Sequence, residues 1–228
     1  MSATQVGRII GVLLLVHLAT GLIVPYMLLR PLTMSPAVFL DIAAGMAPAV
    51  RLNVLLLFVG GTIPLGISIA AWPSIRERSH RLGLWLLALA LANFMLQIIE
   101  NAHWLSMLSV SQAYAGAGPE SAELFRPLGI VVRSAWKWTH YSHLLVVVGW
   151  IFTLHLVFLR SSLAPRALAA AGMFTSVLQV MGITLPAFAG YRMPFPELFG
   201  MPLGVANVAL AGWLIAKGFH DGKPTAPS

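Results

Sequence analysis

Long apolar runs separated by short charged clusters constrain this chain more than any other feature of its sequence. Of its 228 residues, 58% are hydrophobic and only 9% are charged, whereas about a quarter of the residues of a soluble domain are charged. Apolar runs of about 20 residues match the length at which an α-helix crosses the hydrocarbon core of a bilayer. The sequence therefore predicts an all-α, polytopic membrane protein.

Six apolar runs are long enough to cross a membrane. No internal repeat and no separate soluble domain interrupts them, so residues 1–228 are predicted to form a single transmembrane domain, a bundle of six helices. The first run is too long for the apolar core of a signal peptide and no A-x-A site follows it, so we expect it to be retained. The expected spans cover residues 8–29, 52–72, 82–108, 138–159, 167–188 and 201–219.

Basic residues indicate the orientation of these helices. The net charge is +7, and in membrane proteins Lys and Arg gather in cytoplasmic loops. The compact turn SIRERSHR at residues 74–81 is the strongest such signal, and it favours cytoplasmic N and C termini in a bacterial inner membrane. Since no stripe of Arg and Lys interleaves with aromatic residues, the expected partner is the lipid bilayer and not nucleic acid. The chain has no cysteine, which excludes disulfides and thiolate-bound metals.

The third run, residues 82–108, ends in polar residues that hydrocarbon does not favour. Glu100 is the only carboxylate well inside an apolar run, roughly 27 Å from its start at the helical rise per residue. Ionisable groups at membrane depth usually face the bundle interior or a wet cavity, and they mark functional sites. The polar face that contains Glu100 recurs at steps of three and four residues and is formed by Asn93, Gln97 and Trp104.

The fourth run begins at the depth where the third ends, because the two helices run in opposite directions. His140 and His143 lie one turn apart near its start, about 3 to 8 Å into the membrane. If the two helices pack together, both histidines converge with Glu100 and His103 near the outer leaflet. The aromatic and basic residues expected around them are Trp136, Lys137, Trp138 and Tyr141, with Arg192 at the outer mouth. The ligand-binding set is therefore predicted as Asn93, Gln97, His103, Trp104, Lys137, Trp138, Tyr141 and Arg192.

Three hypotheses account for this cluster. In the first, its polar groups only link helices by hydrogen bonds, and its aromatic residues form an interfacial belt. In the second, it binds a small lipophilic ligand, and Glu100 with His140 or His143 is then also a candidate acid–base pair of an enzyme. In the third, His103, His140 and His143 hold zinc or iron, although no H-E-x-x-H motif and no second His-x-x-His pair supports a metal.

Histidines elsewhere in the spans do not indicate haem. Membrane haems need two axial ligands at equal depth on facing helices, whereas His17 and His155 differ in depth by roughly one helical turn. We expect each of them to form hydrogen bonds in the bundle interior. The protein as a whole could also act as a homo-oligomer, as a scaffold subunit of a larger membrane complex or as a small transporter. The cytoplasmic half offers a transporter little polar lining.

Three short motifs carry a resemblance to a known family. They are GRIIGVLLLVHLATGLIVP at residues 7–25, LRSSLAPRALAAAG at residues 159–172 and LAGWLIAKGF at residues 210–219. They are similar to the R-I-A-G-L-like opening, the R-S-x-x-x-P-R turn and the W-L-x-x-K-G close of a bacterial family of small six-helix membrane proteins, catalogued only as a domain of unknown function. The resemblance covers most of the chain by element order and implies a fold and a location, but no activity. The polar third run and RSAWKWTHYSH at residues 133–143 depart from the family pattern.

Overall fold

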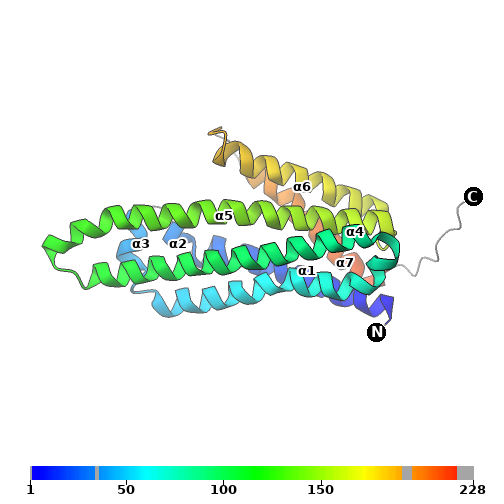
Figure 1. Cartoon of the computed structure of the whole chain (residues 1–228), viewed down its shortest axis with the longest axis horizontal. Helices are drawn as coiled ribbons and strands as arrows, with labels where there is room; N and C mark the ends of the chain where they lie inside the picture. The colour runs from blue at the N-terminus through cyan, green and yellow to red at the C-terminus, as the bar shows by residue number, and fades with distance from the viewer. Residues whose placement is uncertain (1, 34–35, 192–196, 220–228) are drawn as a thin grey trace, which may run out of the picture. The chain divides into compact units, whose positions relative to one another are not determined.

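Helices make up most of the chain over the residues that the computed structural model describes, namely 2–33, 36–191 and 197–219. No strand occurs in those ranges, which confirms the all-α class. The elements are α1 (Ala3–Ile23), the π-helix η1 (Val24–Leu28), α2 (Arg30–Thr33), α3 (Pro36–Ile42), α4 (Ala47–Ala115), α5 (Pro119–Ser161), α6 (Arg166–Ala187) and α7 (Glu197–Lys217) (Figure 1).

Five helical segments of the described chain are long and apolar enough to cross a membrane. A multi-pass membrane protein is therefore confirmed, but the predicted count of six is not. The difference lies in α4, one element of 69 residues that contains both of the spans expected at residues 52–72 and 82–108. The five segments are Ala3–Leu28, Ala47–Ala115, Ser121–Ser161, Arg166–Ala187 and Phe199–Lys217.

Helix α4 reverses direction at Ser79, where φ is −159° and ψ is 71° instead of helical values. The segments before and after Ser79 are the two arms of α4. Residues that contact each other across the arms occur in opposite order along the chain. Asn101 donates a hydrogen bond from Nδ2 to the Val54 carbonyl oxygen over 3.3 Å, and a Cβ at Gly61 would lie 2.7 Å from Cγ of Gln97. The arms are therefore antiparallel, and the reversal falls inside the basic turn expected from the sequence (Figure 1).

The chain divides into two compact units, and the boundaries between them fall within α1, α4 and α5. Unit 1 comprises Met1–Leu18, Ile63–Asn93 and Leu144–Ser228. Unit 2 comprises Ala19–Thr62 and Phe94–His143. Each unit has its own buried core and its own set of buried polar groups.

Several buried polar groups of unit 1 pair with one another, among them Trp150, which is fully buried. The indole Nε1 of Trp150 donates to the Ser68 hydroxyl over 3.0 Å, and that hydroxyl donates to the Pro64 carbonyl oxygen over 2.7 Å. His155, also fully buried, has its Nε2 at 3.2 Å from Oδ1 of Asn207. Helices α6 and α7 pack side by side in this unit (Figure 1).

Unit 1 also contains a close crossing of α1 and α7 that only glycine permits. A Cβ at Gly11 would lie 2.8 Å from the carbonyl oxygen of Ala211, and a Cβ at Gly7 would collide with the backbone of Phe219. The spacing of the two glycines is the small-xxx-small pattern that lets membrane helices approach closely. Helices α1 and α7, which are far apart in the sequence, thus pack directly against each other.

The core of unit 2 places the short helices α2 and α3 against α4 and α5. Ser111 of α4 fixes the end of α3, because its hydroxyl donates to the Leu40 carbonyl oxygen over 2.7 Å and accepts from the Ala44 amide over 2.9 Å. Apolar side chains from all four helices are buried together there. They include Leu32, Phe39, Trp104, Met107 and Trp136.

Candidate functional site

The carboxylate of Glu100 lies between two histidines in unit 2. His140 Nδ1 is 2.9 Å from Glu100 Oε1, and His143 Nδ1 is 2.8 Å from Oε2. Glu100 belongs to the second arm of α4, and the histidines lie one turn apart on α5, so each carboxylate oxygen meets a different ring. The convergence of these three residues, here named the Glu100 cluster, is what the sequence predicted for them.

Both oxygens of Glu100 are occupied, which offsets the cost of placing a carboxylate in a membrane-spanning helix. A carboxylate that accepts from Nδ1–H also fixes the orientation of the imidazole and directs its Nε2 elsewhere. The side chain of Glu100 is only 5% exposed, whereas that of His140 keeps 16% exposure. One edge of the cluster is therefore accessible from outside the protein core.

Aromatic rings extend the cluster along α5. Trp136 stacks on His140 with ring centroids 5.2 Å apart and an angle of 16° between the rings. Trp104 packs against Trp136 from α4 at 4.9 Å. The guanidinium of Arg133 lies 5.9 Å from the centroid of the Trp136 ring and donates to the Thr33 carbonyl oxygen. The residues that α5 contributes recur at steps of three and four, so they share one helix face. They are Arg133, Trp136, His140 and His143.

Of the two predicted amides, Gln97 pairs with a neighbour on its own helix. Gln97 donates from Nε2 to Oδ1 of Asn101 over 3.0 Å, and Asn101 donates in turn to the Val54 carbonyl oxygen. Their role is to bind the two arms of α4 together. Asn93 is buried and belongs to unit 1.

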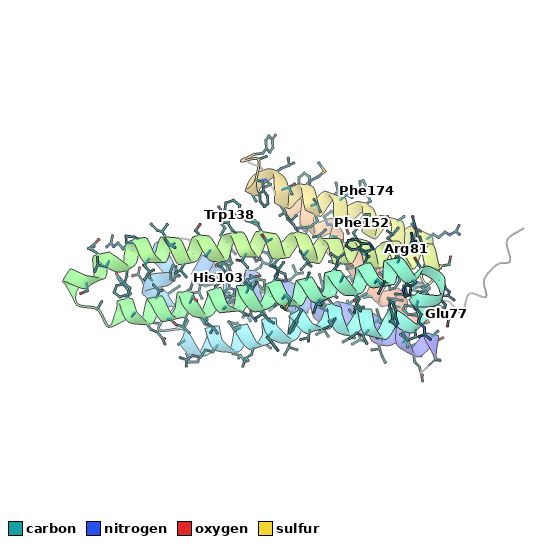
Figure 2. The ribbon with its side chains drawn as sticks, viewed as in Figure 1. Glu77, Arg81, His103, Trp138, Phe152 and Phe174 are labelled. Carbon is teal, nitrogen blue, oxygen red and sulfur yellow. The ribbon has the colours of Figure 1, made fainter. Side chains whose placement is uncertain are left out.

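Of the remaining predicted ligand residues, Tyr141 lies beside the cluster, with its ring centroid 6.2 Å from that of His140. His103, which Figure 2 labels, is only partly buried, and in the described ranges no hydrogen bond or ion pair joins it to Glu100. The ammonium of Lys137 lies 5.1 Å from the Trp138 ring and 6.0 Å from the Tyr141 ring. Trp138 projects outward from α5 (Figure 2) and is 44% exposed. Arg192 lies outside the described residues.

The predicted metal set gains no support from the part of the chain that the structure describes. Within those ranges, no group of three or more His, Asp or Glu side chains is arranged to hold a metal ion. His140 and His143 direct Nδ1 at Glu100, and His103 is not gathered with them. His17, the mid-span histidine of unit 1, packs edge to face against Trp150, with the two ring centroids 5.7 Å apart.

Sequence reasoning missed the contributions of Arg133 and Asn101. A usable signal was present for both, since Arg133 precedes Trp136 by three residues and Asn101 follows Gln97 by four. Residues at these spacings are neighbours on a helix surface. Extending the polar face of each helix by one more step of three or four residues would have included them.

One family matches nearly the whole chain, over residues 9–218, and its description is "Domain of unknown function (DUF4386)". The chain belongs to this family. The resemblance drawn from the three short motifs, to a family catalogued only as a domain of unknown function, is thereby confirmed. No curated protein and no solved structure matches the chain. Since the DUF4386 description specifies no activity, a function for the Glu100 cluster must follow from its own geometry.

Proposed function

We propose that the protein crosses a bacterial inner membrane six times, with both termini in the cytoplasm. A straight helix of 69 residues would be about 100 Å long, and a hydrocarbon core is only about 30 Å thick. The reversal at Ser79 divides α4 into two arms, each long enough to cross once. The basic turn around Ser79 then lies on the cytoplasmic side, where Lys and Arg accumulate.

We further propose that the Glu100 cluster binds the polar end of a small lipophilic molecule. The observation that supports this is the double use of Glu100, which orients two imidazoles at once while His140 stays partly exposed. A site that must present Nε2 of His140 to a ligand needs the ring held from behind, and carboxylates commonly hold functional histidines in this way.

A membrane-embedded enzyme is the second candidate, and one observation favours it. An imidazole whose Nδ1 is held by a carboxylate has the arrangement of a general base, with Nε2 free to take or give a proton. His140 shows this arrangement, and Nδ1 of His143 meets the other oxygen of the same carboxylate. Binding and catalysis would use the same atoms, so identification of the ligand must precede any assay of turnover.

The His140→Asn variant separates ligand binding from a purely structural link. Asparagine places its amide nitrogen where Nδ1 of the histidine lies, so it can still donate to Glu100, but it has no equivalent of Nε2. Wild-type protein purified in a neutral detergent should carry a small lipophilic molecule that mass spectrometry detects, and the variant should lose it while keeping its thermal stability. His80→Ala, at an exposed position of unit 1, is the matched control and should retain the molecule.

Other results would assign a different role. A molecule that stays with His140→Asn as well as with wild-type protein binds elsewhere. If neither protein carries one and their stabilities agree, the cluster serves as a link between helices within a scaffold. A molecule that the wild-type protein converts and the variant only binds identifies an enzyme.

A further inference from the structure

Three buried hydrogen-bond donors of unit 2 have no acceptor among the described residues. They are Nε1 of Trp104, Nε1 of Trp136 and Nε of Arg133. Trp104 is 1% exposed and Trp136 is 7% exposed, so bulk water does not reach either indole. Buried donors are almost always paired in native proteins, and each unpaired one is an exception that needs a cause.

These donors are neighbours. The Trp104 and Trp136 rings are 4.9 Å apart, and the Arg133 guanidinium lies 5.9 Å from the centroid of the Trp136 ring. Their surroundings are apolar, since both indoles belong to the buried core formed with Leu32 and Phe39. A single acceptor group could thus accept hydrogen bonds from several of these donors at one place. Unpaired donors scattered through the protein could not share one acceptor in this way.

Arg133 adds a charge that nothing in the described chain neutralises. Its hydrogen-bond acceptor there is the neutral Thr33 carbonyl oxygen, and no described carboxylate lies within ion-pair distance. The Glu100 cluster touches this region through the stacking of Trp136 on His140. Both oxygens of Glu100 already meet imidazoles, so Glu100 does not serve Arg133.

We propose that Arg133, Trp104 and Trp136 bind the anionic head group, a carboxylate or a phosphate, of an amphiphilic ligand. This inference rests on the proposed function, because it names the chemical class of the ligand's polar end. An anionic oxygen accepts from guanidinium and indole N–H groups in charge-assisted hydrogen bonds, which are stronger than neutral ones. The apolar core around the indoles suits the carbon chain next to such a head group.

Nitrogen-15 labelling of the indoles tests the proposal at the atoms concerned. The chain has seven tryptophans, so an NMR spectrum of the full-length protein in dodecyl maltoside should show seven indole N–H signals. Trp104→Phe and Trp136→Phe assign two of them. Addition of dodecanoate or dodecyl phosphate should move both signals downfield, and dodecanol, which has the same chain without the charge, should not.

Affinity measurements test the role of the charge. Arg133→Gln should weaken binding of dodecanoate about tenfold or more, since a hydrogen bond to a charged group is worth at least that factor. Arg126→Gln is the matched control on the same helix, because the Arg126 side chain is 67% exposed and paired with Glu123. It should leave the affinity within twofold.

The outcomes separate this inference from the proposed function. Shifts produced equally by acetate or inorganic phosphate would identify a free-anion site and overturn the amphiphile. If dodecanol binds through His140 while neither acidic amphiphile moves the indole signals, the head-group inference fails and the proposed function stands. If dodecanoate binds through Arg133 but His140→Asn has no effect, the inference holds and the role of the Glu100 cluster fails. No response to any acidic probe overturns the inference.

Discussion

Replacement of Glu100 by leucine tests whether the Glu100 cluster holds the second arm of α4 to α5. Leucine fills a similar volume but removes the acceptor that lies 2.9 Å from His140 Nδ1 and 2.8 Å from His143 Nδ1. Both imidazole donors would then remain in a mostly buried position without a partner. We expect a large loss in the free energy of unfolding, and a much smaller loss for glutamine.

The magnitude follows from the two hydrogen bonds. Bonds to charged groups contribute about 1.5–3 kcal/mol each in soluble proteins, whereas bonds between membrane helices average about 0.6 kcal/mol with a maximum near 1.7. Because these two bonds are short and involve a carboxylate, the upper membrane value applies, and Glu100→Leu should cost about 3 kcal/mol. Glu100→Gln keeps one acceptor oxygen and offers its amide N–H to the other ring, so it should cost about 1 kcal/mol.

Reversible unfolding in mixed micelles, followed by tryptophan fluorescence, measures these differences. Glu77→Leu is the control, because Glu77 is an exposed carboxylate of α4 near its reversal (Figure 2). That change should alter the free energy of unfolding by no more than about 0.5 kcal/mol. A cost below about 1 kcal/mol for Glu100→Leu would refute the reasoning. Equal costs for leucine and glutamine would show that the charge of Glu100, and not its hydrogen bonds, stabilises the helix pair.

Two further predictions concern packing and topology. Gly172→Ala should lower the free energy of unfolding by about 1–3 kcal/mol, because its Cβ would overlap the His155 ring. Gly204→Ala is the control and should cost little, since Gly204 has open space around it. Equal losses for the two variants in the same unfolding assay would contradict this account. Since the chain has no cysteine, Ser79→Cys and Ala117→Cys can report sidedness. A membrane-impermeant maleimide should label Ala117→Cys in intact cells and Ser79→Cys only after permeabilisation, and labelling of both from one side would exclude a crossing by the second arm of α4.

The sequence was sufficient for the all-α class and for the convergence of Glu100, His140 and His143. Apolar runs of membrane length determine where helices form, because their residues have no other way to satisfy the backbone in lipid. Glu100, His140 and His143 were predictable together, since the antiparallel course of the two helices puts them at one depth. The single turn between His140 and His143 also puts both on one face of α5.

Side-chain partners were not predictable to the same degree. His103 lies near Glu100 in sequence, but the rotation of α4 about its own axis decides which of them meets α5, and that rotation depends on packing across the whole unit. Similarly, the reversal of α4 needs only one non-helical residue, Ser79. The sequence shows that a basic segment separates the two apolar runs. It does not show that this segment keeps helical geometry at every residue except Ser79.

The close crossing of α1 and α7 has a consequence for biosynthesis. Every residue of unit 2 precedes Leu144, so this unit can fold while α6 and α7 are still being made. Gly7 and Gly11, by contrast, pack against Phe219 and Ala211, which are synthesised long after them. Helix α1 therefore enters the membrane well before it acquires this partner. Chains truncated before α7 should expose the glycine face of α1 to cellular quality control.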